Sequence, residues 1–243
     1  MPQFTSLRTS YFALLESYAP QLLAGPEVRT PFQRPRSSSP GAVFIGGVLG
    51  SESDWFADTS YESIRAAVRQ AVKDPSARTI DLFIDSPGGA VLGLPETADV
   101  ISAANLIKPV RSFVTGIAAS AAYWLASQGG TISLTPSGEV GSIGVLDLHV
   151  GIADALKQSG VTVTAVSSTP QKVERAPFTE LSDDARQHMQ KNVDSWYSDF
   201  LSAVRRGRGA RVNANGNYGG GRMLSARDAK QLGLVDFIQK VTL

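Results

Sequence analysis

One serine in the chain has neighbours that suit a catalytic nucleophile. Ser120 stands in the run GIAASAAYW, residues 116–124, among small residues and just before two aromatics. Residues 109–115 are typical of a strand and those after Ser120 of a buried helix, so the free N–H groups of a helix N-terminus should face the hydroxyl. Small neighbours would let a peptide backbone approach Ser120. An ordinary buried helix rich in alanine and serine is the plainer interpretation of this run taken alone.

The run SPGG, residues 86–89, could stabilise the negative charge that develops during acyl transfer. Pro87 fixes a turn between a strand and a helix, and the paired glycines leave their backbone N–H groups open to a substrate. We expect the N–H groups of Gly88 or Gly89, together with that of Ala121, to form an oxyanion hole. The alternative is a plain turn, because many strand-to-helix connections use proline and glycine.

Two residues are candidates for the general base. His149 is the usual proton acceptor in such chemistry. Lys172 serves only when it is neutral, so its amine would have to be shielded from water. It follows a strand candidate, residues 161–166, and sites of α/β proteins gather at strand ends. The residues alone leave both candidates open.

Composition excludes several other chemistries. The chain has no cysteine, which removes disulfides, thiol catalysis and zinc–thiolate sites, and its two histidines argue against a multi-histidine metal site. Its 23 basic and 22 acidic residues give a net charge of +1, too small to attract nucleic acid or a lipid surface. No apolar run approaches the length of a membrane span, and the N-terminus lacks a leader pattern. We expect a cytoplasmic protein without cofactor, metal, nucleic-acid partner or membrane span.

The elements that must position these residues alternate between strand and helix. The expected strands are residues 43–49, 79–84, 110–115, 131–134, 161–166 and 234–238. The expected helices are residues 61–74, 90–106, 120–126, 150–158, a long one after Ser182, and 225–233, with a mobile loop at 207–222. This alternation predicts a layered α/β domain with a largely parallel sheet.

The first 41 residues are expected to stand apart from that domain. Apolar residues recur at helical spacing over residues 5–23, which predicts an amphipathic helix. Residues 26–41 are rich in proline, arginine and serine, as linkers are. We therefore divide the chain into an N-terminal arm with its linker, residues 1–41, and a compact domain, residues 42–243. The helix either packs on its own domain or forms an arm that docks on a neighbouring subunit or is removed on maturation.

Four motifs in order resemble the signal peptide peptidase A family of serine peptidases, the S49 group, whose fold is related to the Clp protease and crotonase superfamily. They are DSPGG at 85–89, GIAASAAYW at 116–124, GSIGV at 141–145 and AKQLGLVD at 229–236. The resemblance runs from about residue 43 to 236. It implies a ClpP/crotonase-like layered α/β domain of repeated β-α units, to which this chain adds its N-terminal helical arm.

The resemblance also implies a catalytic assignment. Ser120 falls on the family's nucleophile, Lys172 on the lysine of a serine–lysine dyad, and Ser142 on a hydroxyl that orients the lysine. His149 would then be a bystander. Members of this length are implied to form homo-oligomeric rings in which adjacent subunits supply the serine and the lysine of one site.

Within that family the chain looks most like phage-encoded members that mature proheads. It has SAAYW in place of the more usual SGGYY, a histidine soon after GSIGV, and no membrane anchor. The expected function is a serine endopeptidase that cleaves scaffold or capsid proteins inside proheads, and the sequence leaves open whether it also cleaves its own N-terminal arm. The alternatives are a bacterial peptidase that degrades signal peptides and a non-catalytic assembly protein on the same scaffold. A crotonase-like acyl-CoA enzyme is a third, although no acidic pair is placed for enolate chemistry.

Overall fold

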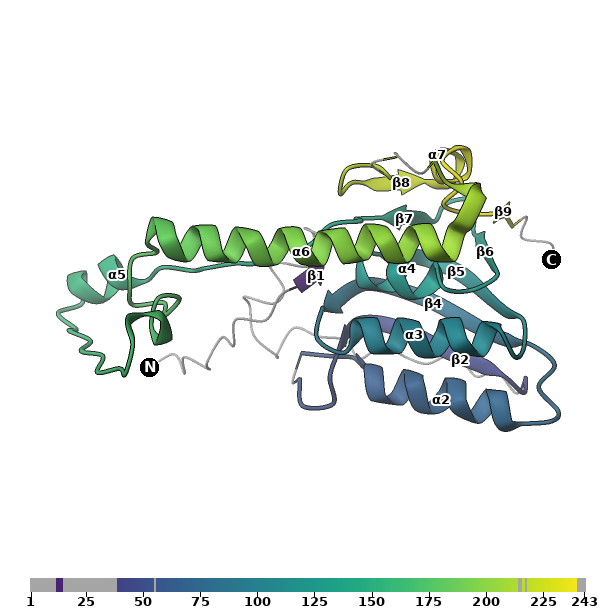
Figure 1. Ribbon diagram of the computed structural model, residues 1–243, viewed down its shortest axis with the longest axis horizontal. Coiled ribbons are helices and arrows are strands. Elements are labelled where there is room, and N and C mark those ends of the chain that lie inside the picture. The colour runs from purple at the N-terminus through teal and green to yellow at the C-terminus, as the bar shows by residue number, and fades with distance from the viewer. Residues whose placement is uncertain (1–11, 15–38, 55, 214–215, 217, 240–243) are drawn as a thin grey trace.

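The structure, a computed structural model, describes residues 12–14, 39–54, 56–213, 216 and 218–239. These residues form a layered α/β domain with one projecting arm (Figure 1). The elements in chain order are β1 (Phe12–Leu14), β2 (Ala42–Gly50), β3 (Thr59–Ser60), α2 (Tyr61–Lys73), β4 (Ile80–Ala90), α3 (Leu94–Asn105), β5 (Val110–Ala119), α4 (Ala121–Ala126), β6 (Thr131–Leu134), β7 (Glu139–Gly141), α5 (Ala153–Gln158), the 3-10 turn η3 (Pro170–Lys172), α6 (Asp183–Arg208), the 3-10 turn η4 (Gly209–Arg211), β8 (Met223–Ser225), α7 (Ala226–Gln231) and β9 (Phe237–Ile238).

The sheet is mostly parallel, as the alternation of elements predicted. Its main path in the described part of the chain is β3-β2-β4-β5-β6-β9, and every neighbouring pair along it is parallel. β7 continues beside the end of β5 and pairs with β8, while β1 lies antiparallel to the end of β4. The α/β class is thus confirmed, and the carboxyl ends of β4 and β5 lie side by side.

Helices cover the buried face of this sheet. α2 places Tyr61, Ile64 and Val68 on its inner side, and Ser60 caps it by accepting a hydrogen bond from Ser63 N at 3.1 Å. α2 packs against α3, and α3 against α4 (Figure 1). The helix predicted at 61–74 is confirmed as α2. Its apolar spacing and its N-cap both favour a helix at this place.

The opposite face of the sheet carries a row of aromatic rings. Phe44, Phe83 and Phe113 are in register on β2, β4 and β5, and their centroids are 5.3 and 5.5 Å apart in succession. Each ring is half-buried, while the residue after it in its strand points into the core. Cross-strand aromatic pairs of this kind stabilise the register of a sheet.

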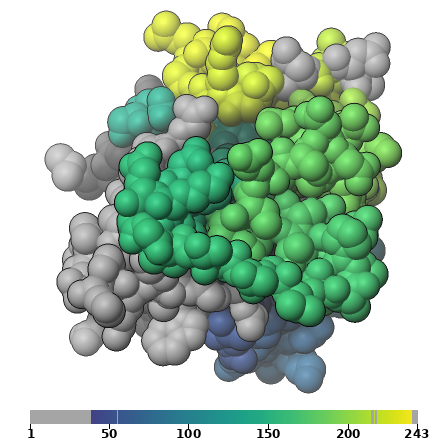
Figure 2. Space-filling view, turned by 90° about the vertical axis from the view of Figure 1, so that its left-hand side faces the viewer, coloured from purple at the N-terminus to yellow at the C-terminus, as the bar shows by residue number. Residues whose placement is uncertain are grey.

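An arm projects from the domain between β7 and the middle of α6. It comprises residues 145–182, including α5 and η3, and the first half of α6 (Figure 1), and it faces the viewer in Figure 2. The strand predicted at 161–166 is wrong: these residues belong to no helix or strand, and Val166 is 97% exposed. The run VTVTAV is rich in β-branched residues, which favours a strand. In the described part of the chain no strand pairs with it, so the strand does not form.

The helix predicted over residues 5–23 is wrong at Phe12–Leu14, which form β1. Three consecutive apolar residues fit either a helix or a strand, and pairing with β4 decides between them here. The remainder of that predicted helix, and residues 26–38 of the predicted linker, lie outside the described residues.

Two predictions near the C-terminus changed in extent. The long helix begins as expected, with Ser182 accepting a hydrogen bond from Ala185 N at 3.1 Å, and runs 26 residues to Arg208. The loop predicted at 207–222 is therefore shorter. Within the described ranges, no helix combines the length and the apolar character that crossing a bilayer requires.

Candidate active site

Ser120 stands at the junction of β5 and α4 in a strained backbone conformation. Its φ is 53° and its ψ is −119°, a region that residues other than glycine rarely adopt. Such a conformation costs roughly 1–3 kcal/mol and is concentrated at functional sites. A serine on a sharp strand-to-helix turn is also the arrangement that presents the nucleophile in α/β-hydrolases. The predicted position is confirmed, and the strain is an additional feature that the sequence did not reveal.

Neighbouring backbone holds Ser120 in this conformation. Its N–H donates to Gly141 O at 2.8 Å, and its own carbonyl accepts from Trp124 N at 3.0 Å. Its Oγ lies 3.4 Å from Gly144 O. The serine is fully buried, as is Ala121 after it. The small residues of this run therefore serve close packing in the core, in addition to any approach by a substrate.

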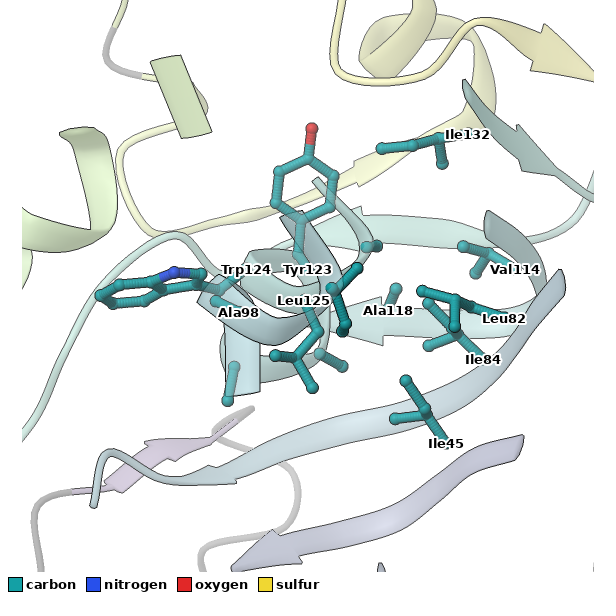
Figure 3. Packing of buried hydrophobic residues seen from close by; sticks show 14 of the residues in the cluster. Ile45, Leu82, Ile84, Ala98, Val114, Ala118, Tyr123, Trp124, Leu125 and Ile132 are labelled. Carbon is teal, nitrogen blue, oxygen red and sulfur yellow. The ribbon is translucent and has the colours of Figure 1, made fainter. Parts of the chain in front are cut away.

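The two aromatics after the serine anchor α4 in the core. Tyr123 donates from its hydroxyl to Leu234 O at 2.7 Å, and burial raises its pKa. Trp124 stacks on Phe200 of α6 with ring centroids 4.8 Å apart. Figure 3 shows the two rings leaving α4 in different directions. Together they fix the short helix against the C-terminal segment and α6, and with it Ser120 at the helix N-terminus.

Ser142 follows β7 and also has a positive φ, 49°. Its N–H donates to Arg222 O at 2.9 Å. Because Ser120 bonds to Gly141 and lies near Gly144, the turn that contains Ser142 stands directly beside the candidate nucleophile. Among the described residues other than glycine, only these two serines and Tyr218 have a positive φ.

The SPGG run continues β4 instead of opening a helix at once, and α3 begins later, at Leu94. Ser86 pairs with Ala118 of β5, which places the run beside the end of the strand that precedes Ser120. Gly88 has φ 99°, and its N–H donates to Ser86 Oγ at 3.1 Å. In this conformation the amide of Gly88 is thus engaged by its own turn.

Gly89 is required for a reason other than the predicted one. A Cβ built on it would lie 1.8 Å from Leu49 O of β2, so the neighbouring strand leaves no room for a side chain. Strand packing therefore demands glycine here whether or not the amide faces a substrate.

Asp85 is a positioning residue that sequence reasoning did not single out. Its Oδ1 accepts from Ile117 N at 3.0 Å, at the point where the register between β4 and β5 shifts. A Cβ on Gly116 would lie 2.5 Å from the same oxygen, so Gly116 makes room for this carboxylate. The signal was present, since the aspartate opens DSPGG and the glycine opens GIAASAAYW.

Neither candidate base reaches Ser120 within one chain. Lys172 is exposed, at the end of η3, and the segment that bears it lies at the far end of the arm from α4 (Figure 1). His149 is also in the arm, with Nε2 3.3 Å from Ala176 O. The structure therefore brings Ser120, the turn of Ser142 and the SPGG run together and leaves Lys172 apart. The described residues hold no cluster of three or more histidine or carboxylate groups that would bind a metal ion.

Comparison with known proteins places the chain in a family. A model described as peptidase family S49 matches residues 103–242. Capsid assembly protease C of Escherichia phage lambda is 36% identical over 146 residues, which cover 60% of this chain and 33% of that protein. The head-tail preconnector protein GP5 of Enterobacteria phage P21 is 36% identical over 166 residues, 68% of this chain and 33% of that protein.

A bacterial relative is more distant. Protease 4 of Salmonella typhi is 28% identical over 195 residues, which cover 80% of this chain and 31% of that protein. The chain thus spans about a third of the length of these relatives. The family match covers more than half of the chain, from α3 to the C-terminal segment, and includes Ser120, Ser142 and Lys172. On this basis the chain belongs to peptidase family S49.

Proposed function

We propose that the protein is a serine endopeptidase with Ser120 as nucleophile and Lys172 as general base. The observation that carries the proposal is the strained φ of Ser120, 53°, at a strand-to-helix junction inside the region that matches the peptidase family. Strain at a serine in such a turn has no evident packing benefit, since a glycine would adopt it freely. It is understandable where the hydroxyl must be presented to a substrate.

The reaction would follow the general course of acyl transfer. Neutral Lys172 takes the proton of Ser120, whose Oγ attacks the peptide carbonyl carbon, and the N–H groups of Ala121 and Gly88 or Gly89 stabilise the oxyanion. The C–N bond breaks as the lysine returns the proton to the leaving amine. Water, deprotonated by the same lysine, then attacks the acyl carbon, and the lysine returns the proton to Ser120 Oγ as the bond between that oxygen and the acyl carbon breaks. Ser142 would orient the amine through its hydroxyl, and His149 takes no part.

A second copy of the chain would complete this site. Lys172 is exposed at the end of a projecting arm, whereas Ser120 is buried in the domain. Docking of the arm on a neighbouring domain would bring the amine to the serine and remove it from water at the same time. A closed ring meets this need for every copy, because each subunit then gives its arm to the next.

The substrates we propose are scaffold or capsid proteins, cleaved inside proheads in the host cytoplasm. The support is the identity of 36% to two phage proteins, one named for capsid assembly and one for the head-tail connection. Bacterial relatives reach 28% for Protease 4 and 27% for a putative signal peptide peptidase of Enterococcus faecium. Degradation of signal peptides is therefore the less favoured role.

The test combines labelling with cleavage. Purified oligomer is treated with a serine-directed phosphonate, and the protein is also expressed with the products of neighbouring genes, whose masses are then measured. Labelling at Ser120, and cleavage that Ser120→Ala and Lys172→Ala each abolish while His149→Ala does not, would support the proposal. An unlabelled Ser120 in a well-formed oligomer would favour an assembly protein without catalysis. If His149→Ala is inactive while Lys172→Ala remains active, the histidine is the general base.

A further inference from the structure

The N-terminal strand β1 lies on the part of β4 that borders the candidate nucleophile. It runs antiparallel to β4, with Phe12 opposite Ala90, Ala13 opposite Gly89 and Leu14 opposite Gly88. The other edge of β4 is already taken, because Val48 and Leu49 of β2 pair with the same glycines. β1 therefore adds a strand on the free edge of the candidate oxyanion segment.

That edge is free because β5 leaves β4 just before the nucleophile. The two strands are paired as far as Ser86 and Ala118, and the chain then turns sharply at Ser120 into α4. Beyond that pair, β1 is the strand among the described residues that lies on this side of residues 88–90. An open edge of this kind accepts an extended peptide through main-chain hydrogen bonds. In this structure the occupant is a segment of the same chain.

β1 runs in the direction that places its carboxyl end nearer to the reacting groups. Because β1 is antiparallel, its carboxyl end, Leu14, lies at Gly88, and its amino end lies at Ala90, farther along β4. Gly88 is nearer along β4 to the Ser86–Ala118 pair, from which Ser120 follows by two residues. The carboxyl end of the strand is thus the end nearer the nucleophile.

The groups around β1 are in a closed arrangement. Ser120 is 0% exposed, and its Oγ is directed to Gly144 O. Gly88 and Gly89 are buried, and the N–H of Gly88 is bonded to Ser86 Oγ. A peptide from outside meets neither the hydroxyl nor the edge of β4 until something moves away.

We propose that β1 occupies the peptide-binding edge of its own active site and keeps that site closed until it is displaced. This rests on the proposed function for its consequence, but the strand pairing is a separate claim with its own test. The ligand class that follows is an extended polypeptide segment that lies antiparallel to residues 88–90. Displacement of β1 by such a segment of another protein opens the site. The N-terminal segment therefore controls when the peptidase acts.

The pairing is tested without relying on activity. Amide hydrogen exchange is measured on the full-length Ser120→Ala protein, in which the N-terminal segment cannot be cut by the chain's own active site. Residues 12–14 and residues 86–90 should both exchange slowly. If residues 12–14 exchange at the rate of an unstructured chain, the inference is overturned. This measurement requires no substitution in β1.

A substitution in β1 then tests the dependence of one strand on the other. Ala13→Pro removes a backbone N–H and is incompatible with a paired central position, whereas Ala13→Thr suits a strand and is the matched control. In the Ser120→Ala background, Ala13→Pro should raise exchange at residues 88–90 about tenfold, and Ala13→Thr should not. A synthetic peptide of residues 8–20, added to the Ala13→Pro protein, should restore the protection. Equal exchange in the two variants would overturn the inference.

The effect on the active site is read separately. With Ser120 present, Ala13→Pro should react with the serine-directed phosphonate about tenfold faster than Ala13→Thr, since the occupant is lost. Slower or equal labelling would contradict the closed state. If no variant is labelled at all while residues 88–90 respond as expected, the proposed peptidase chemistry fails and the strand-binding edge stands.

Discussion

Arg175 donates a hydrogen bond from Nη2 to Asp147 Oδ1, in an ion pair whose aspartate side chain is only 1% exposed. The pair joins the stretch of the arm that follows β7 to the stretch that follows Lys172. A backbone hydrogen bond supports it, from Ile152 N to Pro177 O at 2.7 Å. The segment that bears the candidate base is therefore held at a defined position on the arm, although the lysine itself is exposed.

Removing the charge of Asp147 should loosen that segment. Asp147→Asn keeps the shape of the side chain but loses the buried charge partner of Arg175, and we expect residues 169–179 to exchange amide hydrogens faster and peptide hydrolysis to fall about tenfold. Asp154→Asn is the matched control, because its pair with Lys157 is 86% and 69% exposed. Equal activity of the two variants would show that the ion pair does not position the lysine.

Two inactive variants should restore activity when they are mixed. If adjacent copies share each site, a Ser120→Ala subunit still supplies Lys172 and a Lys172→Ala subunit still supplies Ser120. Rings reassembled from an equal mixture should regain roughly a quarter of the wild-type sites, measured as phosphonate labelling and peptide hydrolysis. Complete inactivity of mixed oligomers, shown to contain both variants, would mean that one chain supplies both groups.

Ser142 should show opposite effects on stability and activity. Its φ of 49° costs a residue with a Cβ about 1 kcal/mol, and glycine avoids this cost. We expect Ser142→Gly to leave the free energy of unfolding unchanged or slightly higher, yet to lower turnover because the hydroxyl that we propose orients Lys172 is gone. Thermal unfolding and hydrolysis of a peptide, measured on the same sample, give the two readings. Unchanged turnover would remove Ser142 from the proposed site.

Gly89→Ala should destabilise the fold itself. The added Cβ would lie 1.8 Å from Leu49 O, so β2 and β4 must separate, at a cost of about 3 kcal/mol. Gly144→Ala is the control for stability, because the nearest atom to its Cβ would be Gly221 Cα at 3.7 Å. Denaturant unfolding of both variants decides the matter, and equal midpoints would show that the two strands adapt without cost.

Asp236 should make stability depend on acid. Burial disfavours its charge, but hydrogen bonds from Arg208, at 2.9 Å to each carboxylate oxygen, and from Ile132 N outweigh burial and lower its pKa. A carboxyl whose pKa is lower in the folded state stabilises the fold above its unfolded pKa, near 4, and loses that contribution as the pH falls through its folded pKa.

The measurement is the free energy of unfolding at neutral pH and at about pH 3. Asp236→Asn should cost about 3 kcal/mol at neutral pH, because the guanidinium of Arg208 is fully buried. The loss of stability towards pH 3 should also be smaller in this variant than in the wild type. Asp199→Asn, on the exposed side of α6, should change neither value. A wild-type slope in Asp236→Asn would assign the acid sensitivity to another group.

The sequence predicted the main strands and helices well where two local signals agreed. α2 and α6 each carry an apolar stripe and have a serine at the N-cap in the structure, and both begin where expected. Local signals do not show which strands will pair with one another. Residues 161–166 have the composition of a strand but no edge to join, while the three residues of β7 form a strand because β5 and β8 lie on either side.

The candidate site was predicted in part for the same reason. Residue types pointed to Ser120 and the SPGG run, the resemblance to the S49 family added Ser142, and the structure brings the three together. Backbone strain at the two serines has no signature in residue type, since neither is glycine. The fit of Asp85 against Gly116 could be seen only once β4 and β5 were placed side by side.

The straightness of α6 links the two ends of the molecule. The helix spans 26 residues, about 39 Å, without proline, and its one glycine, Gly207, lies in the last turn against Ser127 O. Its inner half stacks on Trp124 through Phe200, and its outer half belongs to the arm. A rod of this kind does not absorb a tilt along its length. A displacement of the tip is therefore carried along α6 to Phe200 and its contact with Trp124, in the short helix that begins directly after Ser120.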